Sequence, residues 1–356
     1  MINARSIEIL NGGIIYGSTF GAGKAGSIKL VVVDQLLIDS KSGDVDTGIY
    51  SRAESESTGG AGSIDIEASE LQIVGSKGLI DTSTAASGNA GDIVISSATL
   101  ALADGGSIFS KSSGTCRAGS ISIDAAGDVT INNGSSINTE TIDGFDLDNP
   151  AFIKLTAGDL LLDGGSRITT NANGSANAGN IDLRVDNTIQ LLANSSLSTE
   201  STRGGGGQIN VIVNDLLYLN DSAMTTKVEQ DGNQSDGGDI FVDPIFIVLN
   251  NSMITANAID GNGGNITLIA DYINQSTDSQ ITASSQLGVD GEITIDAFDA
   301  QVDTGENSLA ADFLDASQWQ QQACAQRSGS DVSSFIIEQR PLRPSPHDDW
   351  SVSREL

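Results

Sequence analysis

A five-residue pattern, a glycine followed by two alternating apolar positions, recurs through most of the 356-residue chain. It reads Gly-x-Ile-x-Ile/Leu/Val, with an alanine in the glycine place of one copy. The copies begin at Gly26, Gly62, Gly91, Gly119, Ala151, Gly179, Gly207, Gly238, Gly264 and Gly291. Successive copies are 36, 29, 28, 32, 28, 28, 31, 26 and 27 residues apart. Such a period predicts a solenoid in which every repeat forms one coil.

Two further patterns follow the first within each repeat. The glycine unit places apolar side chains two residues apart, as in Ile64 and Ile66, and a second alternating pair follows, as in Leu100 and Leu102. A turn rich in Asn, Asp and Gly then leads to a third unit, Ser-x-Ile/Leu/Met-x-Thr/Ala. Clear copies of the third unit begin at Ser135, Ser166, Ser195, Ser252 and Ser279. Alternation is typical of strands with one buried face, so each repeat predicts three short strands.

The three strands predict an all-β fold, a right-handed single-stranded parallel β-helix of about ten three-strand coils over residues 1–300. With neighbouring strands about 4.8 Å apart, the nine intervals make a rod of roughly 45 Å. Propeller blades need about 40 or more residues with aromatic markers, and leucine-rich repeats need an Asn or Cys ladder, so both fit less well. A β-sandwich would not repeat one side-chain pattern so many times.

The acidic charge of the chain argues against two classes of binding partner. It carries 47 acidic and 17 basic residues, a formal net charge of −30, which disfavours nucleic acid and anionic lipid because phosphate binding needs clustered Lys and Arg. No run of about 18 apolar residues predicts a membrane span. The first residues do not form a signal peptide, so we expect either a cytoplasmic protein or the downstream piece of a longer export substrate. Two distant cysteines, Cys116 and Cys324, cannot supply a disulfide framework.

Insertions between the third strand and the next glycine account for the longer spacings. They fall at residues 54–60, 141–150 and 229–236, so the loops should share one edge of the rod. Solenoids often place binding sites on such loops, but surface loops also tolerate insertions, and both interpretations stay open. Residues 6–14 already show the strand, turn and strand of the repeat, and no polar cap precedes them. We therefore expect the natural product to extend upstream, or the first coil to fray.

The composition changes after about residue 300. Both tryptophans, the single histidine and three of the five prolines lie in the last 40 residues. Residues 301–356 are therefore expected to form a separate, short and irregular C-terminal tail or cap.

The coil pattern and the tail together resemble the large exoproteins of the filamentous haemagglutinin type, which two-partner secretion systems export. The tail contributes a cysteine, a Ser-x-Phe-like segment and a Pro-rich stretch. These residues are Cys324, Ser334, Phe335, Arg340, Pro341, Pro344 and Pro346. The tail departs from the family ending, because the stretch Glu338-Gln339-Arg340-Pro341 stands in place of its Gly-rich part and only one tail cysteine is present.

This resemblance implies a non-catalytic, secreted or cell-surface protein of a Gram-negative-type bacterium, an adhesin-like rod that binds host or environmental surfaces or glycans. It also implies an outer-membrane two-partner-secretion transporter as partner. The chain would then be the C-terminal portion of a larger exoprotein, and an inert fragment of one is an alternative. A polysaccharide lyase or hydrolase is the other alternative, since such enzymes share the fold.

Catalysis would require paired carboxylates on neighbouring coils, about 5–9.5 Å apart for a glycosidase. Asp65 and Asp182 share the outward column within the glycine unit but lie four coils apart. Asp92, Asp239 and Glu292 follow their glycines and are likewise never in consecutive coils. We therefore expect no catalytic residues and no enzymatic activity.

Metal and cofactor signals are weak. Asp143, Asp146 and Asp148 lie in an Asp-rich loop and are weak calcium candidates, as is the turn at 229–233, but neither matches a known calcium-binding spacing. His347, the single histidine, could be considered as a haem or metal ligand, but we expect it to be a solvated tail residue. The stretch 203–207 is Gly-rich but lacks the Gly-Lys-Ser/Thr ending of a phosphate loop, so it predicts a coil corner. We expect no cofactor.

The most regular polar feature is the Ser and Thr columns beside the third strand. Stacked hydroxyls can bond to neighbouring coils, which would give them a structural role. A flat repeated hydroxyl face could alternatively bind sugars or ice.

Overall fold

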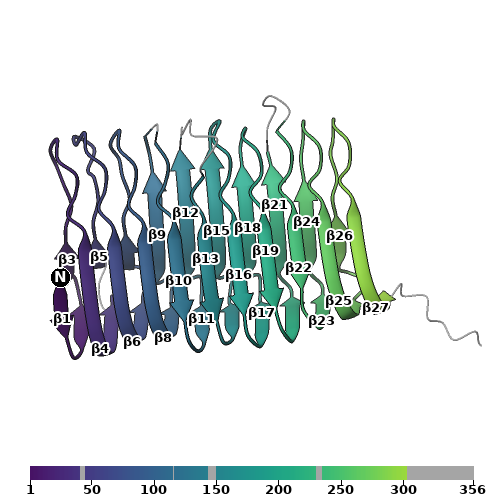
Figure 1. The fold of residues 1–356 in the computed structure, drawn as a ribbon, viewed down its shortest axis with the longest axis horizontal. Coiled ribbons are helices and arrows are strands. Elements are labelled where there is room, and N and C mark those ends of the chain that lie inside the picture. The colour runs from purple at the N-terminus through teal and green to yellow at the C-terminus, as the bar shows by residue number, and fades with distance from the viewer. Residues whose placement is uncertain (41–44, 115, 143–149, 230–234, 303–356) are drawn as a thin grey trace, which may run out of the picture. The chain divides into compact units, whose positions relative to one another are not determined.

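The computed structural model describes residues 1–40, 45–114, 116–142, 150–229 and 235–302. These residues contain 27 strands and no helix, and hence no helix suited to crossing a membrane. Every pairing is parallel, and the strands form one sheet of 17 and a second of 10. Figure 1 shows the coils stacked side by side along one axis, as the sequence predicts. The chain is thus a parallel β-solenoid of about ten turns.

The first and second strands of the coils build the larger sheet, and the third strands build the smaller one. The larger sheet contains β1 (Ile2–Ala4), β2 (Ile7–Leu10), β4 (Ile28–Asp39), β6 (Ile64–Val74), β8 (Ile93–Ala103), β10 (Ile121–Ala125), β11 (Val129–Asn132), β13 (Ile153–Ala157), β14 (Leu160–Asp163), β16 (Ile181–Val185), β17 (Thr188–Leu192), β19 (Ile209–Val213), β20 (Leu216–Asn220), β22 (Ile240–Asp243), β23 (Phe246–Asn250), β25 (Ile266–Gln275) and β27 (Ile293–Val302). The smaller sheet contains β3 (Ile14–Tyr16), β5 (Thr47–Tyr50), β7 (Gly78–Asp81), β9 (Ser107–Ser112), β12 (Ser136–Ile142), β15 (Arg167–Asn173), β18 (Ser196–Ser201), β21 (Ala223–Val228), β24 (Met253–Asn257) and β26 (Gln280–Thr282).

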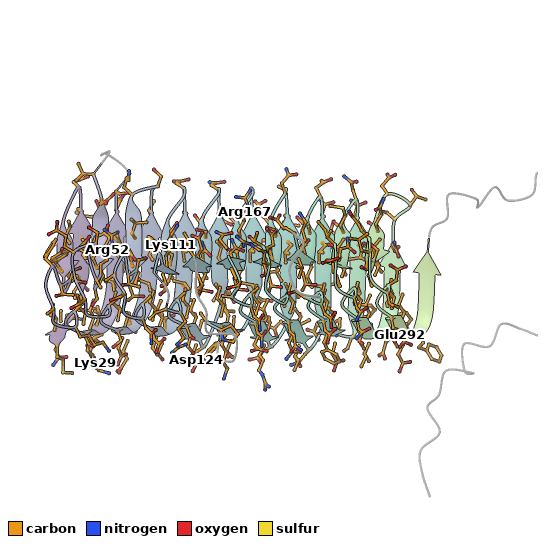
Figure 2. The ribbon with its side chains drawn as sticks, turned by 90° about the horizontal axis from the view of Figure 1, so that it is seen from above. Lys29, Arg52, Lys111, Asp124, Arg167 and Glu292 are labelled. Atoms are coloured by element: carbon orange, nitrogen blue, oxygen red, sulfur yellow. The ribbon has the colours of Figure 1, made fainter. Side chains whose placement is uncertain are left out.

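The apolar columns predicted from the repeat form the core. Ile64 pairs with Ile93, and Ile121 with Ile153, each at 0% exposure. The second and third units stack in the same way, so that one apolar cluster runs through the coils. Outward residues form parallel rows along the rod, and in Figure 2 Lys29, Asp124 and Glu292 lie along one edge.

The first two strands of a coil are not always separate, which differs from the three-strand expectation. In β4, β6, β8, β25 and β27 they run on as a single strand of ten to twelve residues. Where they separate, a turn-forming residue stands at the corner, such as Gly127, Gly158 or Pro244. These residue types interrupt a strand, whereas Ser69 and Ala98 at the same corner do not.

The repeated glycines allow adjacent coils to meet backbone to backbone. A methyl group on Gly119 would lie 1.8 Å from the carbonyl oxygen of Gly91, and one on Gly207 would lie 1.9 Å from that of Gly179. No side chain fits at such a distance. Glycine is therefore a steric requirement at these positions, whereas Ala151 occupies the same place in one coil.

The buried hydroxyls of the third strands bind the same glycine column. The Thr226 Oγ1 donates to the carbonyl oxygen of Gly238 at 2.5 Å, and the Thr199 Oγ1 to that of Gly207 at 2.7 Å. The serine at the start of the third unit forms a hydrogen bond to the adjacent coil: the Ser252 Oγ accepts from the backbone N–H of Ser222 at 3.1 Å. These bonds confirm the structural role predicted for the Ser and Thr columns.

Candidate functional site

Several residues singled out from the sequence lie outside the described residues. These are the calcium candidates Asp143, Asp146 and Asp148, His347, and the tail residues Cys324, Ser334, Phe335, Arg340, Pro341, Pro344 and Pro346. Cys116 is described and half-buried, and its thiol donates to the carbonyl oxygen of Ser87 at 2.8 Å. The Gly-rich stretch at 204–207 leads into β19 and packs against the preceding coil.

The carboxylates considered for catalysis have structural partners. Asp65 accepts from the Lys29 Nζ at 2.9 Å, an exposed ion pair between adjacent coils. The Asp92 Oδ1 accepts from the backbone N–H of Ser120 at 2.9 Å, and the Asp239 Oδ1 from that of Asn265 at 2.8 Å. The side chains that directly follow the glycines thus accept hydrogen bonds from the backbone of the next coil.

One pair of aspartates in consecutive coils was not predicted from the sequence. Asp128 and Asp159 precede Val129 and Leu160, which pair in β11 and β14. The Asp159 Oδ1 accepts from the Thr188 Oγ1 at 2.7 Å, and this bond holds the pKa of Asp159 below its ordinary value. A carboxyl kept ionised in this way is unsuited to act as a general acid. The repeated Gly-Asp before the second apolar pair was the signal that could have found them.

A buried cluster on the smaller sheet contains the one described carboxyl group whose pKa is clearly raised. Asp81 is 1% exposed, and burial raises its pKa although Arg52 pairs with it and partly opposes the effect. The guanidinium of Arg52 lies 4.2 Å from the ring centre of Tyr50, whose pKa burial also raises. A substrate cannot reach a carboxyl this enclosed, so the cluster is an internal ion pair.

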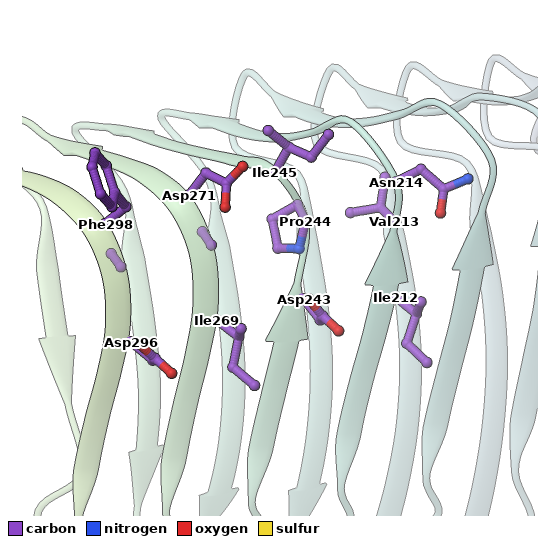
Figure 3. A pocket seen from close by; sticks show the side chains of 12 residues that line it. Ile212, Val213, Asn214, Asp243, Pro244, Ile245, Ile269, Asp271, Asp296 and Phe298 are labelled. Carbon is purple, nitrogen blue, oxygen red and sulfur yellow. The ribbon is translucent and has the colours of Figure 1, made fainter.

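An open groove lies over the last coils of the described rod, as Figure 3 shows. Its volume is about 560 Å³, and it spans the ends of β19 and β22, the corners that follow them, and the middle of the long strands β25 and β27. The lining residues are Ile212, Val213, Asn214, Asp243, Pro244, Ile245, Ile269, Ala270, Asp271, Asp296, Ala297 and Phe298.

Apolar and acidic side chains alternate along the groove. The pairing of Ile212 with Asp243, and of Ile269 with Asp296, places these four in one outward column. Asp243 and Asp296 are therefore two coils apart, about 10 Å, with Ile269 between them. At the corner, Phe298 is 89% exposed. The groove thus offers carboxylate acceptors on an apolar floor.

Two aromatic rings stack beside this groove. Phe246 and Tyr272 directly follow the lining residues Ile245 and Asp271, and their ring centres are 5.2 Å apart with planes inclined by 13°. They are 43% and 44% exposed. The stacked rings on neighbouring coils form an exposed apolar patch, and such patches are typical of binding surfaces.

Among the residues that the structure describes, the groove has no cationic side chain that could bind phosphate, and its aspartates do not converge as a metal site. No Lys, Arg, His or Cys is among its lining residues. Nowhere in the described ranges do three His, Cys, Asp or Glu side chains come together as a metal site.

No protein-family model matches the chain, and neither a curated protein nor a solved structure is similar enough to match it.

Proposed function

We propose that this chain is a non-catalytic adhesive module, a rod that binds glycans on a surface through the groove and the exposed aromatic stack beside it. The observation that carries the proposal is the exposed Phe246–Tyr272 stack beside a groove with Asp243, Asp271 and Asp296. Apolar faces of sugar rings pack on aromatic rings, and their hydroxyls bond to carboxylates and amides.

The resemblance to filamentous haemagglutinin-type exoproteins supports a place for this rod outside the cell. In this proposal the chain is the C-terminal portion of a larger secreted or cell-surface protein, exported by an outer-membrane two-partner-secretion transporter. A rigid solenoid suits that role because its rows of outward side chains are held at fixed spacing.

The absence of catalysis is part of the proposal. Asp159 is held ionised by Thr188, and Asp81 is buried beside Arg52. Asp243 and Asp296, although both open to the groove, are separated by Ile269. None of these arrangements pairs an accessible general acid with a base.

A glycan array with the purified chain tests adhesion. We expect binding to a subset of glycans, and the double variant Phe246→Ala/Tyr272→Ala should lose it. Phe152→Ala is the matched control, because Phe152 is 40% exposed, directly precedes β13 of the same sheet and lies outside the groove. Binding that survives the double variant, or no binding by the wild type, would overturn the proposal.

An assay for reducing or unsaturated sugar ends tests the absence of turnover on the glycans that bind. We expect no release above the buffer blank. If release occurs and Asp243→Asn or Asp296→Asn stops it, the chain is a carbohydrate-active enzyme, and the non-catalytic proposal is wrong.

A further inference from the structure

A second groove lies on the same sheet, around Phe241. Its volume is about 380 Å³, and it is formed by the first strands of neighbouring coils. The lining residues are Asp182, Gln208, Ile209, Asn210, Asp239, Ile240, Phe241, Asn265 and Thr267. Phe241 stands between Asn210 and Thr267 in one outward column. The groove therefore combines one aromatic face with amide, hydroxyl and carboxylate groups.

Several polar groups of this groove are available to a ligand. Within the described part of the chain, the amide of Gln208 and the hydroxyl of Thr267 have no hydrogen-bond partner. Asn210 donates to the Asp182 Oδ1 at a long 3.3 Å, so both groups can exchange this contact for a ligand hydroxyl. Small numbers of such groups around an apolar face are typical of a site for a polar organic ligand.

The two grooves adjoin along the strand direction. Phe241 lines the second groove, and Asp243, two residues further along β22, lines the groove of Figure 3. Side chains two residues apart on a strand point to the same face at about 6.6 Å. From Asp239 to Phe246 the coil spans at most roughly 23 Å of extended chain. One extended ligand can therefore contact Phe241 and the Phe246–Tyr272 stack together.

The charge around the grooves selects the ligand. Asp182, Asp239, Asp243, Asp271 and Asp296 line them, and neither is lined by Lys or Arg. Two cations adjoin the grooves in register, Lys154 beside Asp182 and Arg184 beside Ile212, but neither is among the lining residues. Sulfated, sialylated or uronic glycans would meet this row of carboxylates at short range and be repelled.

We infer that the Phe241 groove and the groove of Figure 3 form one track for an uncharged oligosaccharide, which lies parallel to the strands from Gln208 to the Phe246–Tyr272 stack. This inference rests on the proposed function, because it names the class of glycan and the length of chain that the adhesive module binds.

Titration calorimetry with cello-, malto- and chito-oligosaccharides from two to six units, and with sulfated counterparts, tests the track. For the neutral series that binds, we expect the hexamer to bind at least tenfold more tightly than the dimer. Phe241→Ala should raise the Kd of the hexamer at least tenfold, and the sulfated counterparts should not bind. Circular dichroism and Tm confirm that the variant folds.

Phe109→Ala is the matched control, since Phe109 is a half-buried outward aromatic on the smaller sheet, and it should leave binding unchanged. If the wild type binds neutral glycans but Phe241→Ala has no effect, or sulfated glycans bind equally well, the track is wrong while adhesion stands. If none of the oligosaccharides binds and the array is also blank, the proposed function fails.

Discussion

At the scale of single residues, neighbouring threonines have opposite roles in this fold. In β21, Thr226 is 0% exposed and its hydroxyl bonds to the Gly238 carbonyl, whereas Thr225 points outward toward Thr255. The sequence located the hydroxyl columns, because they recur in the Ser-x-Ile-x-Thr unit. It could not identify the glycine carbonyl as partner, since that contact depends on how the loop returns the chain to the next coil.

We expect Thr226→Val to lower the free energy of unfolding by about 1–3 kcal/mol, because the change preserves side-chain shape but leaves a buried carbonyl without its donor. Thr225→Val, one residue away, should stay within about 0.5 kcal/mol of the wild type. Urea unfolding of both variants measures the difference. Equal effects of the two substitutions would show that the bond to Gly238 adds nothing.

The bond between Thr188 and Asp159 makes a second residue-scale prediction, concerning pH. Because this bond lowers the folded-state pKa of Asp159, its stabilisation is present above the unfolded value of about 3.9 and is lost as pH falls through the folded pKa. Thr188→Val should therefore be less stable than wild type at pH 7, by less than about 1 kcal/mol since the pair is largely solvated.

The stability difference between Thr188→Val and wild type should shrink as pH falls from about 3.9 through the lower folded-state pKa of Asp159, as the carboxyl group is protonated in both proteins. Urea unfolding across that pH range measures it. Thr99→Val is the control, because Thr99 lies in the same outward column and has no bond to a carboxylate among the described residues. A difference that stays constant with pH would exclude the ionised carboxylate as the cause.

At the scale of strands, alternation in the sequence was enough to place nearly every core residue. Ile64, Ile93 and Ile121 point inward because a strand with one buried face needs apolar residues at every second position. Strand limits were less predictable. Whether the first two strands fuse depends on the corner residues. Gly158 and Pro244 stand where a strand ends, whereas Asp34 and Asp271 stand at the corners of fused strands, so residue type alone does not fix the limits.

The glycine column gives the prediction at this scale. We expect Gly119→Ala to destabilise the fold by about 1–3 kcal/mol or more, because the new methyl group would lie 1.8 Å from the Gly91 carbonyl oxygen and force the coils apart. Gly21→Ala is the matched control: nothing lies within 4 Å of its added methyl group. It should be neutral or stabilising by up to about 1 kcal/mol. Equal loss in both variants, measured by thermal unfolding, would refute the steric explanation.

At the scale of the whole molecule, the candidate site could not be read from the sequence. Phe241 was visible as one outward residue among many, and Asp243, Ile269 and Asp296 lie 26 or 27 residues apart. They become neighbours only through the register of the coils. A groove forms only where neighbouring outward side chains project to different extents from the sheet. Sequence spacing gives the register, but it does not give the shape of the surface.

The net charge of −30 gives the prediction for the whole rod. Carboxylates repeat along the coils at strand spacing, so self-repulsion should oppose folding at low salt. Raising NaCl from about 0.01 M to about 1 M shortens the Debye length from about 30 Å to about 3 Å. We therefore expect Tm to rise by several degrees.

Ion pairs between coils that remain accessible to solvent, such as Lys29 with Asp65 and the half-buried Lys111 with Glu140, weaken in salt and act in the opposite direction. Each contributes no more than about 1 kcal/mol, and the 17 basic residues can pair with fewer than half of the 47 acidic ones, so repulsion should dominate. Near pH 4 many carboxylates are protonated, and the same salt step should then raise Tm much less. A fall in Tm with salt at pH 7 would mean that the ion pairs outweigh the repulsion, whereas an equal rise at both pH values would assign the effect to salt-strengthened burial of apolar surface rather than to screening.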